Sequence, residues 1–325
     1  MLIRPRRNRK SEAIRNMVQE NVVTVNDLIF PIFITEGNNK KIPVASMPGI
    51  SRFSLDLLLE EINECIALGI QGFCLFPQYS EEKKDKFATE SVNDEGLYLS
   101  AIRKIKADFP QICLMTDVAM DPYSSDGHDG LVENGKIVND KTLEILAKMA
   151  LAQCRAGADI LGPSDMMDGR VGYIREAIDN EGFTDVSIMS YTAKYASAFY
   201  GPFRDALDSA PKFGDKKTYQ MNPANSREAI IEAELDASEG ADFLMVKPAL
   251  PYLDIIRLLK DNFQQPIAAY NVSGEYAMIK AAAQNGWLDG TKAMNEALLS
   301  IKRAGADIIL TYFAKEFALQ VKSNS

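Results

Sequence analysis

Two lysines stand where the sequence predicts the ends of buried strands. Lys247 follows the apolar run 243–246 and precedes Pro248, and Lys194 closely follows the apolar run 186–191. A lysine rarely lies in such a setting without a partner. An uncharged lysine amine attacks carbonyl carbons and forms Schiff bases, so the two residues predict amine chemistry on a carbonyl substrate. A buried salt bridge is the alternative interpretation of Lys247.

Such an amine must lose its proton near neutral pH. Lowering a lysine pKa from ~10.4 to ~7 costs roughly 4.6 kcal/mol. A second ammonium ~6 Å away supplies about 2.8 kcal/mol of this at an effective dielectric constant of ~20, and desolvation can supply the rest. Lys194 is the candidate for the second charge, because the predicted strands that lead into Lys194 and Lys247 are consecutive along the chain.

Other predicted strands also lead into polar side chains. The strands at 112–118, 158–162, 267–272 and 307–312 run into Asp117, Ser164, Asp165, Ser273 and Tyr312. The carboxyl ends of parallel barrel strands face one mouth, so these groups are predicted to converge there. Two long connections, 119–139 and 195–223, follow strands at the same mouth and are predicted to be functional loops or lids.

The elements that must position these groups repeat along the chain. Short apolar or β-branched runs alternate with amphipathic helical stretches, and the runs cover 28–34, 70–76, 112–118, 158–162, 186–191, 242–247, 267–272 and 307–312. This alternation predicts an α/β protein, a (β/α)8 TIM barrel over 26–325 with an extended N-terminal arm over 1–25. A doubly wound sheet is the second interpretation, but the chain has neither a G-x-G-x-x-G nor a Walker A sequence.

The composition is that of an ordinary globular protein. The 325 residues are 46% hydrophobic and 25% charged, and the net charge of −9 argues against nucleic-acid binding. No apolar run approaches the ~18 residues of a membrane span, and the basic start has no apolar stretch typical of a secretory signal. The four cysteines are widely spaced, which favours buried thiols over disulfides. We therefore expect a cytoplasmic protein without a nucleic-acid or membrane partner.

Several longer stretches resemble the porphobilinogen synthase family, also called 5-aminolaevulinate dehydratase. The stretches are 191–197 (YTAKYAS), 199–204 (FYGPFR), 219–223 (YQMNP), 245–248 (MVKP) and 272–276 (VSGEY). The resemblance implies a lyase of haem and chlorophyll biosynthesis that condenses two molecules of 5-aminolaevulinate to porphobilinogen. It also implies a homo-octamer, and whether that octamer exchanges with smaller assemblies stays open.

The resemblance assigns the two lysines to two substrate molecules. Lys247 would bind the molecule that forms the propionate side of the product, at the P site. Lys194 would bind the molecule that forms the acetate side, at the A site. Ser273 and Tyr312 would bind the P-site carboxylate.

The 195–223 connection would be the lid of the family. Its Arg204 and Lys216 would bind the A-site carboxylate. Arginine can pair with a carboxylate through two parallel hydrogen bonds, whereas lysine offers a point charge. The neighbouring Lys217 is an alternative to Lys216.

The connection after residue 118 differs from that of the zinc-dependent relatives. These carry three cysteines where this chain has Ala119, Asp121 and Asp129. Thiolates form tight tetrahedral zinc sites, whereas carboxylates suit a hard cation or none, so no catalytic zinc is expected. Whether Asp117, Asp121 and Asp129 bind another active-site cation is left open.

The resemblance further implies a magnesium-type member of the family. An allosteric Mg²⁺ that keeps most of its water would bind at Glu232, on a helix that begins near Ser226. One carboxylate with several waters fits the reluctance of Mg²⁺ to dehydrate. A solvated helix surface is the alternative interpretation of Glu232.

Two other functions compete with this one. A class I aldolase would need one Schiff-base lysine, which leaves the second lysine unexplained. A non-catalytic barrel, kept as a structural or regulatory partner, would tolerate loss of a lysine, but both are present.

Overall fold

Eight parallel strands close into a barrel in the computed structural model, which describes residues 1–209 and 211–324. The strands are β1 (Leu28–Thr35), β4 (Gly72–Gln78), β5 (Cys113–Val118), β8 (Ile160–Pro163), β9 (Ser187–Lys194), β10 (Phe243–Lys247), β11 (Ile267–Asn271) and β12 (Ile308–Thr311). Each pairs in parallel with the next, and β12 pairs with β1. The predicted (β/α)8 barrel is therefore confirmed, with strand bounds within a few residues of the expected ranges.

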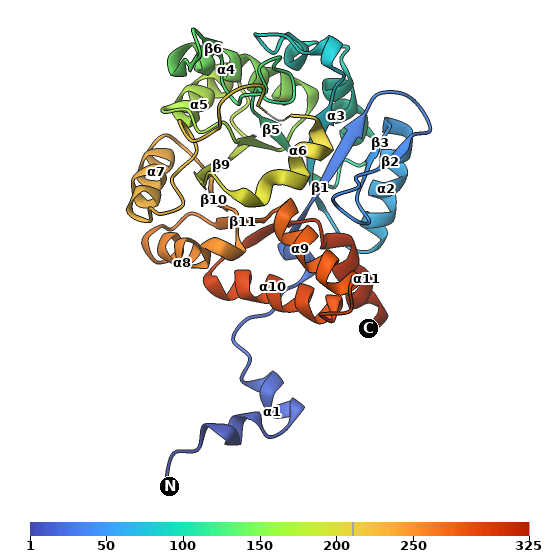
Figure 1. The fold of residues 1–325 in the computed structure, drawn as a ribbon, viewed down its shortest axis with the longest axis vertical. Coiled ribbons are helices and arrows are strands. Elements are labelled where there is room, and N and C mark those ends of the chain that lie inside the picture. Colours follow the sequence, from blue (N-terminus) through green and yellow to red (C-terminus); the bar gives the residue numbers. More distant parts are fainter. Residues whose placement is uncertain (210, 325) are drawn as a thin grey trace.

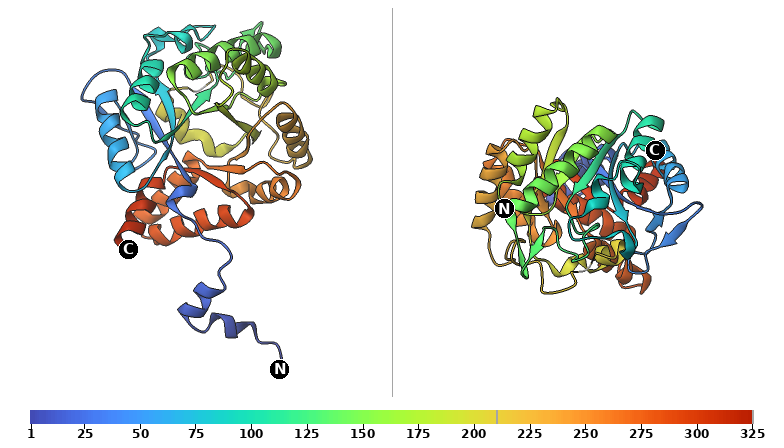
Figure 2. Two further views of the ribbon diagram at one scale, coloured as in Figure 1. Left: turned by 180° about the vertical axis from the view of Figure 1, so that it is seen from behind. Right: turned by 90° about the horizontal axis from the view of Figure 1, so that it is seen from above.

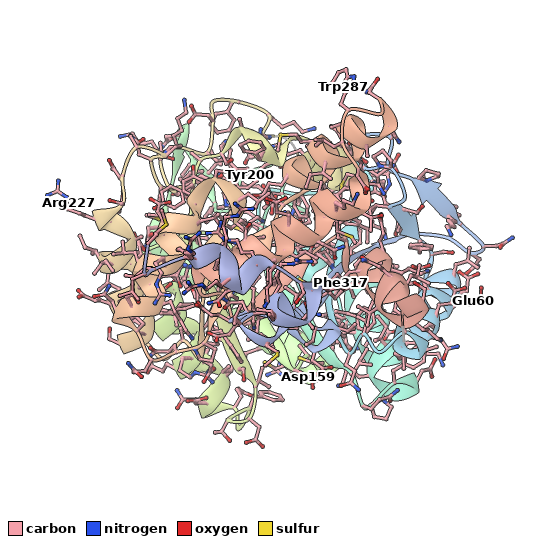
Figure 3. The ribbon with its side chains drawn as sticks, turned by 90° about the horizontal axis from the view of Figure 1, so that it is seen from below. Glu60, Asp159, Tyr200, Arg227, Trp287 and Phe317 are labelled. Carbon is pink, nitrogen blue, oxygen red and sulfur yellow. The ribbon has the colours of Figure 1, made fainter. Side chains whose placement is uncertain are left out.

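Helices form a ring around the barrel, as Figures 1 and 2 show. They are α2 (Leu55–Ala67), α3 (Leu97–Asp108), α4 (Asn139–Ala156), α5 (Arg170–Asn180), α7 (Arg227–Ser238), α8 (Leu253–Asn262), α9 (Ser273–Gln284), α10 (Gly290–Ala304) and α11 (Ala314–Asn324). Glu60 on α2 and Arg227 on α7 lie at opposite edges of the ring (Figure 3). Gly157 ends α4 at a φ of 104°, where a side chain would strain the backbone.

The chain before β1 extends away from the barrel (Figures 1 and 2). It carries the 3-10 turn η1 (Pro5–Arg9) and the short helix α1 (Glu12–Met17), neither of which has a buried residue. The division of the chain at residue 25 into arm and barrel stays a prediction. Within the described residues, no helix is long and apolar enough to span a membrane.

Two small hairpins add to the barrel and were not expected from the sequence. In the first, β3 (Ser51–Phe53) extends the sheet beside β1 and pairs with β2 (Lys41–Pro43). In the second, β6 (Val132–Glu133) pairs with β7 (Lys136–Ile137) in the connection after β5. Strands of two or three residues are too short to show an alternating pattern, so tertiary contacts must define them.

The long connection after β9 crosses the barrel mouth. It contains η5 (Ala198–Tyr200) and α6 (Gly201–Leu207), and α6 lies over the centre of the barrel in Figure 1. Phe203 of α6 packs against Phe33 of β1 and Phe76 of β4, with ring centroids 5.9 and 5.1 Å away. These contacts hold the connection close to the strand ends.

Candidate active site

The two lysines lie side by side at the barrel mouth. Lys194 is the last residue of β9 and Lys247 the last residue of β10, and the parallel pairing of these strands places the two residues in register. Each is only 6% exposed. The predicted position of the two lysines at neighbouring strand ends is therefore confirmed by the strand pairing.

Aromatic rings surround the amine of Lys247. Its Nζ lies 4.6 Å from the ring centroid of Tyr270, 4.9 Å from that of Tyr191, 5.1 Å from that of Phe203 and 5.4 Å from that of Tyr200. Lys247 forms no ion pair with any described residue, so the salt-bridge interpretation is wrong. Ring faces attract a cation but cannot accept its protons as a carboxylate can.

The environment of Lys247 favours the uncharged amine. Burial and then the nearby Lys194 charge lower the pKa of Lys247, and with the opposing carboxylates of Asp117, Asp121 and Asp129 the net value is about 7. These two causes, desolvation and a second ammonium, are those expected from the sequence. At neutral pH a substantial fraction of this amine can act as a nucleophile.

Lys194 occupies a different, charged environment. Its Nζ donates to Asp129 Oδ2 at 3.0 Å and to the carbonyl oxygen of Ser164. Asp129 is fully buried and also accepts a hydrogen bond from Lys216 through Oδ1. Burial alone would raise the pKa of Asp129, but the two lysines together lower it. One carboxylate is thus shared by Lys194 on the barrel and Lys216 in the connection after β9.

The structure distinguishes Lys216 from its neighbour. The Lys216 side chain is 7% exposed and also pairs with Asp121 at 3.2 Å. Lys217 pairs with Asp215 at 3.3 Å and its side chain is 73% exposed. Lys216 therefore points into the site, while Lys217 faces outward.

The Lys216 ammonium lies between two of the three carboxylates that were candidates to bind an active-site cation. It contacts both Asp121 and Asp129. Among the residues that the structure describes, no three His, Cys, Asp or Glu side chains gather as metal ligands. Asp121 and Asp129 therefore pair with the chain's own Lys216 ammonium.

The lid is also tied to the loop after β5 by His128, which sequence reasoning left without a role. Its Nδ1 lies 3.0 Å from the hydroxyl of Tyr219, and its Nε2 lies 3.1 Å from the carbonyl oxygen of Phe213. The partners lie about 90 residues away along the chain. In the sequence, the only feature that could have pointed to a role for His128 was that it is the sole histidine.

The predicted P-site carboxylate ligands lie beside the aromatic rings around Lys247. Ser273 Oγ accepts a hydrogen bond from the Phe203 N–H at 2.9 Å, and the Tyr312 hydroxyl lies 3.0 Å from that of Tyr270. Arg204 is half-buried on α6 and forms no ion pair within the described part of the chain. Its guanidinium thus remains available for a carboxylate.

Glu232 lies on α7. It lines a cavity of about 910 Å³ together with Asp168 and Glu228, and the same cavity also reaches Phe213 and Tyr219 of the connection after β9. Burial raises the pKa of Glu232, Arg170 opposes this and nearby carboxylates add to it, so that the net value is about 7. These described side chains do not gather as a three-ligand metal group, but a Mg²⁺ ion that keeps most of its water needs only one or two carboxylates.

Comparison with known proteins agrees with this geometry. The family model for delta-aminolevulinic acid dehydratase matches residues 2–320. The chain belongs to the delta-aminolevulinic acid dehydratase family. One curated relative is the enzyme of Bradyrhizobium diazoefficiens, which is 55% identical over 99% of this chain and 92% of its own length. Another is the chloroplastic enzyme of rice, which is 57% identical over 97% of this chain and 74% of its own length.

A solved member of the delta-aminolevulinic acid dehydratase family has nearly the same fold. The crystal structure of the Toxoplasma gondii enzyme, in complex with its reaction product porphobilinogen, superposes with a TM-score of 0.98. The two sequences are 54% identical, and the match covers 100% of this chain and 93% of the Toxoplasma chain. The predicted function, a porphobilinogen-forming lyase of porphyrin biosynthesis, is thereby confirmed for this chain as a family member.

Proposed function

We propose that the chain joins two molecules of 5-aminolaevulinate through Schiff bases at Lys247 and Lys194. The observation that carries this proposal is the pairing of the two lysines in register at adjacent strand ends. The aromatic surroundings and the lowered pKa of Lys247 favour its uncharged, nucleophilic form. The family resemblance assigns Lys247 to the P-site substrate and Lys194 to the A-site substrate, and the proposal keeps that assignment.

Each lysine performs the same first step. Its uncharged amine attacks the ketone carbon of one substrate molecule, and loss of water from the carbinolamine gives the Schiff base. Lys194 must first release its proton. Burial, then the Asp121 charge, raise the pKa of the nearby Asp117 to about 7. Asp117 can therefore accept or return a proton near neutral pH.

The carboxylate of each substrate needs its own binding groups. Ser273 and Tyr312 supply hydroxyls beside Lys247, and Arg204 and Lys216 supply cations on the lid. Lys216 must exchange its contacts with Asp121 and Asp129 for the A-site carboxylate, or contact all three. Lid movement thus accompanies substrate binding in this proposal.

Borohydride trapping followed by mass spectrometry tests the proposed function. 5-Aminolaevulinate should form covalent adducts at both Lys247 and Lys194. A class I aldolase would instead be trapped by a sugar phosphate at one lysine, and a scaffold would be trapped by neither compound. Absence of any aminolaevulinate adduct at the two lysines contradicts the proposal.

Trapping at Lys247 should depend on pH in a characteristic way. With levulinate, which has the ketone and carboxylate but lacks the amine, we expect the rate to rise about tenfold between pH ~6 and ~8 and then level off. The uncharged fraction of an amine with a pKa near 7 saturates over this range. An ordinary lysine would give a rise of about 100-fold without levelling, which would contradict the assignment.

The lid cations should affect substrate affinity more than the chemical step. Arg204→Ala should raise the 5-aminolaevulinate concentration needed for half-maximal rate, because the A-site carboxylate loses a bidentate partner. Lys216→Ala should raise it less, and Lys217→Ala, the outward-facing neighbour, should leave it unchanged. An unchanged concentration dependence in both Arg204→Ala and Lys216→Ala would show that the lid does not bind this carboxylate.

We further propose that the chain is a magnesium-type, cytoplasmic member of the family that acts as a homo-octamer. The absence of cysteine at positions 119, 121 and 129 disfavours a catalytic zinc. Glu232, with Asp168 and Glu228 around the same cavity, would hold the hydrated Mg²⁺. The ion would supply a charge that stabilises one assembly state, and the chemistry itself needs only side chains.

Magnesium should therefore stimulate turnover through Glu232 by favouring the active assembly. A ligand at 100 times its Kd stabilises the state that it binds by at most ~2.7 kcal/mol, which is enough for a large population shift. Glu232→Gln should remove the stimulation and the magnesium-dependent change in sedimentation, while basal turnover stays near wild type. Glu234→Gln, on the exposed side of the same helix, is the matched control. Stoichiometric zinc in the active protein, or normal stimulation of Glu232→Gln, would contradict this proposal.

A further inference from the structure

A fully buried carboxylate at the start of α9 has no part in the chemistry described above. Glu275 is 0% exposed. Its Oε1 accepts a hydrogen bond from the Leu250 N–H at 2.5 Å. Its Oε2 accepts from the Val272 N–H at 2.5 Å and from Asn271 Nδ2 at 3.1 Å. The carboxylate therefore links the loop after β10 to the end of β11.

The network continues to the end of β12. Asn271 Oδ1 accepts a hydrogen bond from the Thr311 hydroxyl at 2.9 Å, and Thr311 Oγ1 accepts from the Phe313 N–H at 3.1 Å. Asn271 and Thr311 are also 0% exposed. We call Glu275, Asn271 and Thr311 the strand-end clasp. Together they connect the carboxyl ends of three consecutive strands.

Each clasped segment carries one proposed P-site group. Lys247 ends β10, three residues before Leu250. Ser273 directly follows Val272, and Tyr312 lies between Thr311 and Phe313. None of the A-site residues follows these strands.

The energetics argue for a positioning role. Burying a carboxylate is costly unless hydrogen bonds compensate it, and an apolar residue of similar size would avoid the cost. The hydrogen bond from the Val272 N–H to Glu275 caps the first turn of α9, as in a capping box, and so it has a purely local role. The contacts of Glu275 to Leu250 and Asn271 reach beyond that turn and fix one strand end against the next.

We propose that the strand-end clasp positions Lys247, Ser273 and Tyr312 relative to one another, and so sets the geometry of the P site. This inference rests on the proposed Schiff base at Lys247. The substrate ketone must reach the amine while its carboxylate reaches the two hydroxyls, and small displacements of these groups slow such reactions strongly. Clasp residues act through the backbone and are positioning residues.

Levulinate trapping at each lysine, resolved by peptide mass, tests the proposal in the full-length protein. Thr311→Val removes the hydroxyl with little change of shape, and Glu275→Gln replaces an acceptor oxygen by a donor nitrogen. Thr311→Ser keeps the hydroxyl and serves as the rescue variant. Thr116→Val is the matched control, because Thr116 is also 0% exposed but lies on β5, where its hydroxyl donates to the Ile160 carbonyl oxygen at 3.4 Å.

We expect Thr311→Val and Glu275→Gln to slow trapping at Lys247 by about tenfold or more, equivalent to ~1.4 kcal/mol. Trapping at Lys194 should stay within about twofold, and Thr311→Ser and Thr116→Val should react like wild type at both lysines. Unchanged trapping at Lys247 in both clasp variants, or equal slowing at both lysines, would overturn the inference. Failure of the wild type itself to form an adduct at Lys247 would instead overturn the proposed function.

Discussion

Lys247→Ala should abolish porphobilinogen formation, and Lys194→Ala should do the same. Each substitution removes the amine that would hold one substrate molecule, and within residues 1–209 and 211–324 no other lysine shares the paired strand-end position. The loss should exceed about 1000-fold, because covalent activation and correct placement of the substrate are lost together. A colorimetric pyrrole assay on purified variants measures it.

The fold of both variants should persist, since both side chains face the barrel mouth and alanine leaves the strand pairing intact. Near-ultraviolet circular dichroism checks this. Lys148→Ala, on the exposed side of α4, is the control and should keep full activity. More than about a tenth of wild-type activity in either strand-end variant, a loss under ~1.4 kcal/mol, would show that two Schiff bases are not required.

Asp129→Asn should destabilise the protein and disable the site together. The substitution leaves the Lys194 and Lys216 ammoniums buried without their shared carboxylate. Removing one partner of a buried ion pair costs about 3–5 kcal/mol. We expect a loss of this order in the free energy of unfolding at pH ~7, measured in urea, and a drop in turnover of about 100-fold or more.

The stability loss should depend on pH with a definite sign. The folded-state pKa of Asp129 is lowered, so its stabilising contribution is present above the unfolded-state pKa of ~3.9 and is lost as the pH falls through the folded-state value. The difference between wild type and Asp129→Asn should therefore shrink in acid. Asp126→Asn, in the same loop but without an ion pair in the described chain, should lose little stability. A similar loss in both variants would point to loop disruption rather than to the shared carboxylate.

The sequence predicted the barrel because its signals are local. Strands and helices alternate along the chain, and the predicted strands lie within a few residues of the observed bounds. The parallel pairing of consecutive strands follows from that alternation. The hairpins β2–β3 and β6–β7 escaped prediction because so few residues in each form strand pairs.

The sequence by itself determined that Lys194 and Lys247 end neighbouring strands, since strand order in a barrel follows chain order. Only the tertiary structure decided what surrounds them. The rings of Tyr191, Phe203 and Tyr270 around Lys247, and the choice of Lys216 over Lys217, depend on the path of a long lid over the mouth. Such contacts join segments that are distant in sequence, and burial and charge act through space, so no local pattern encodes them.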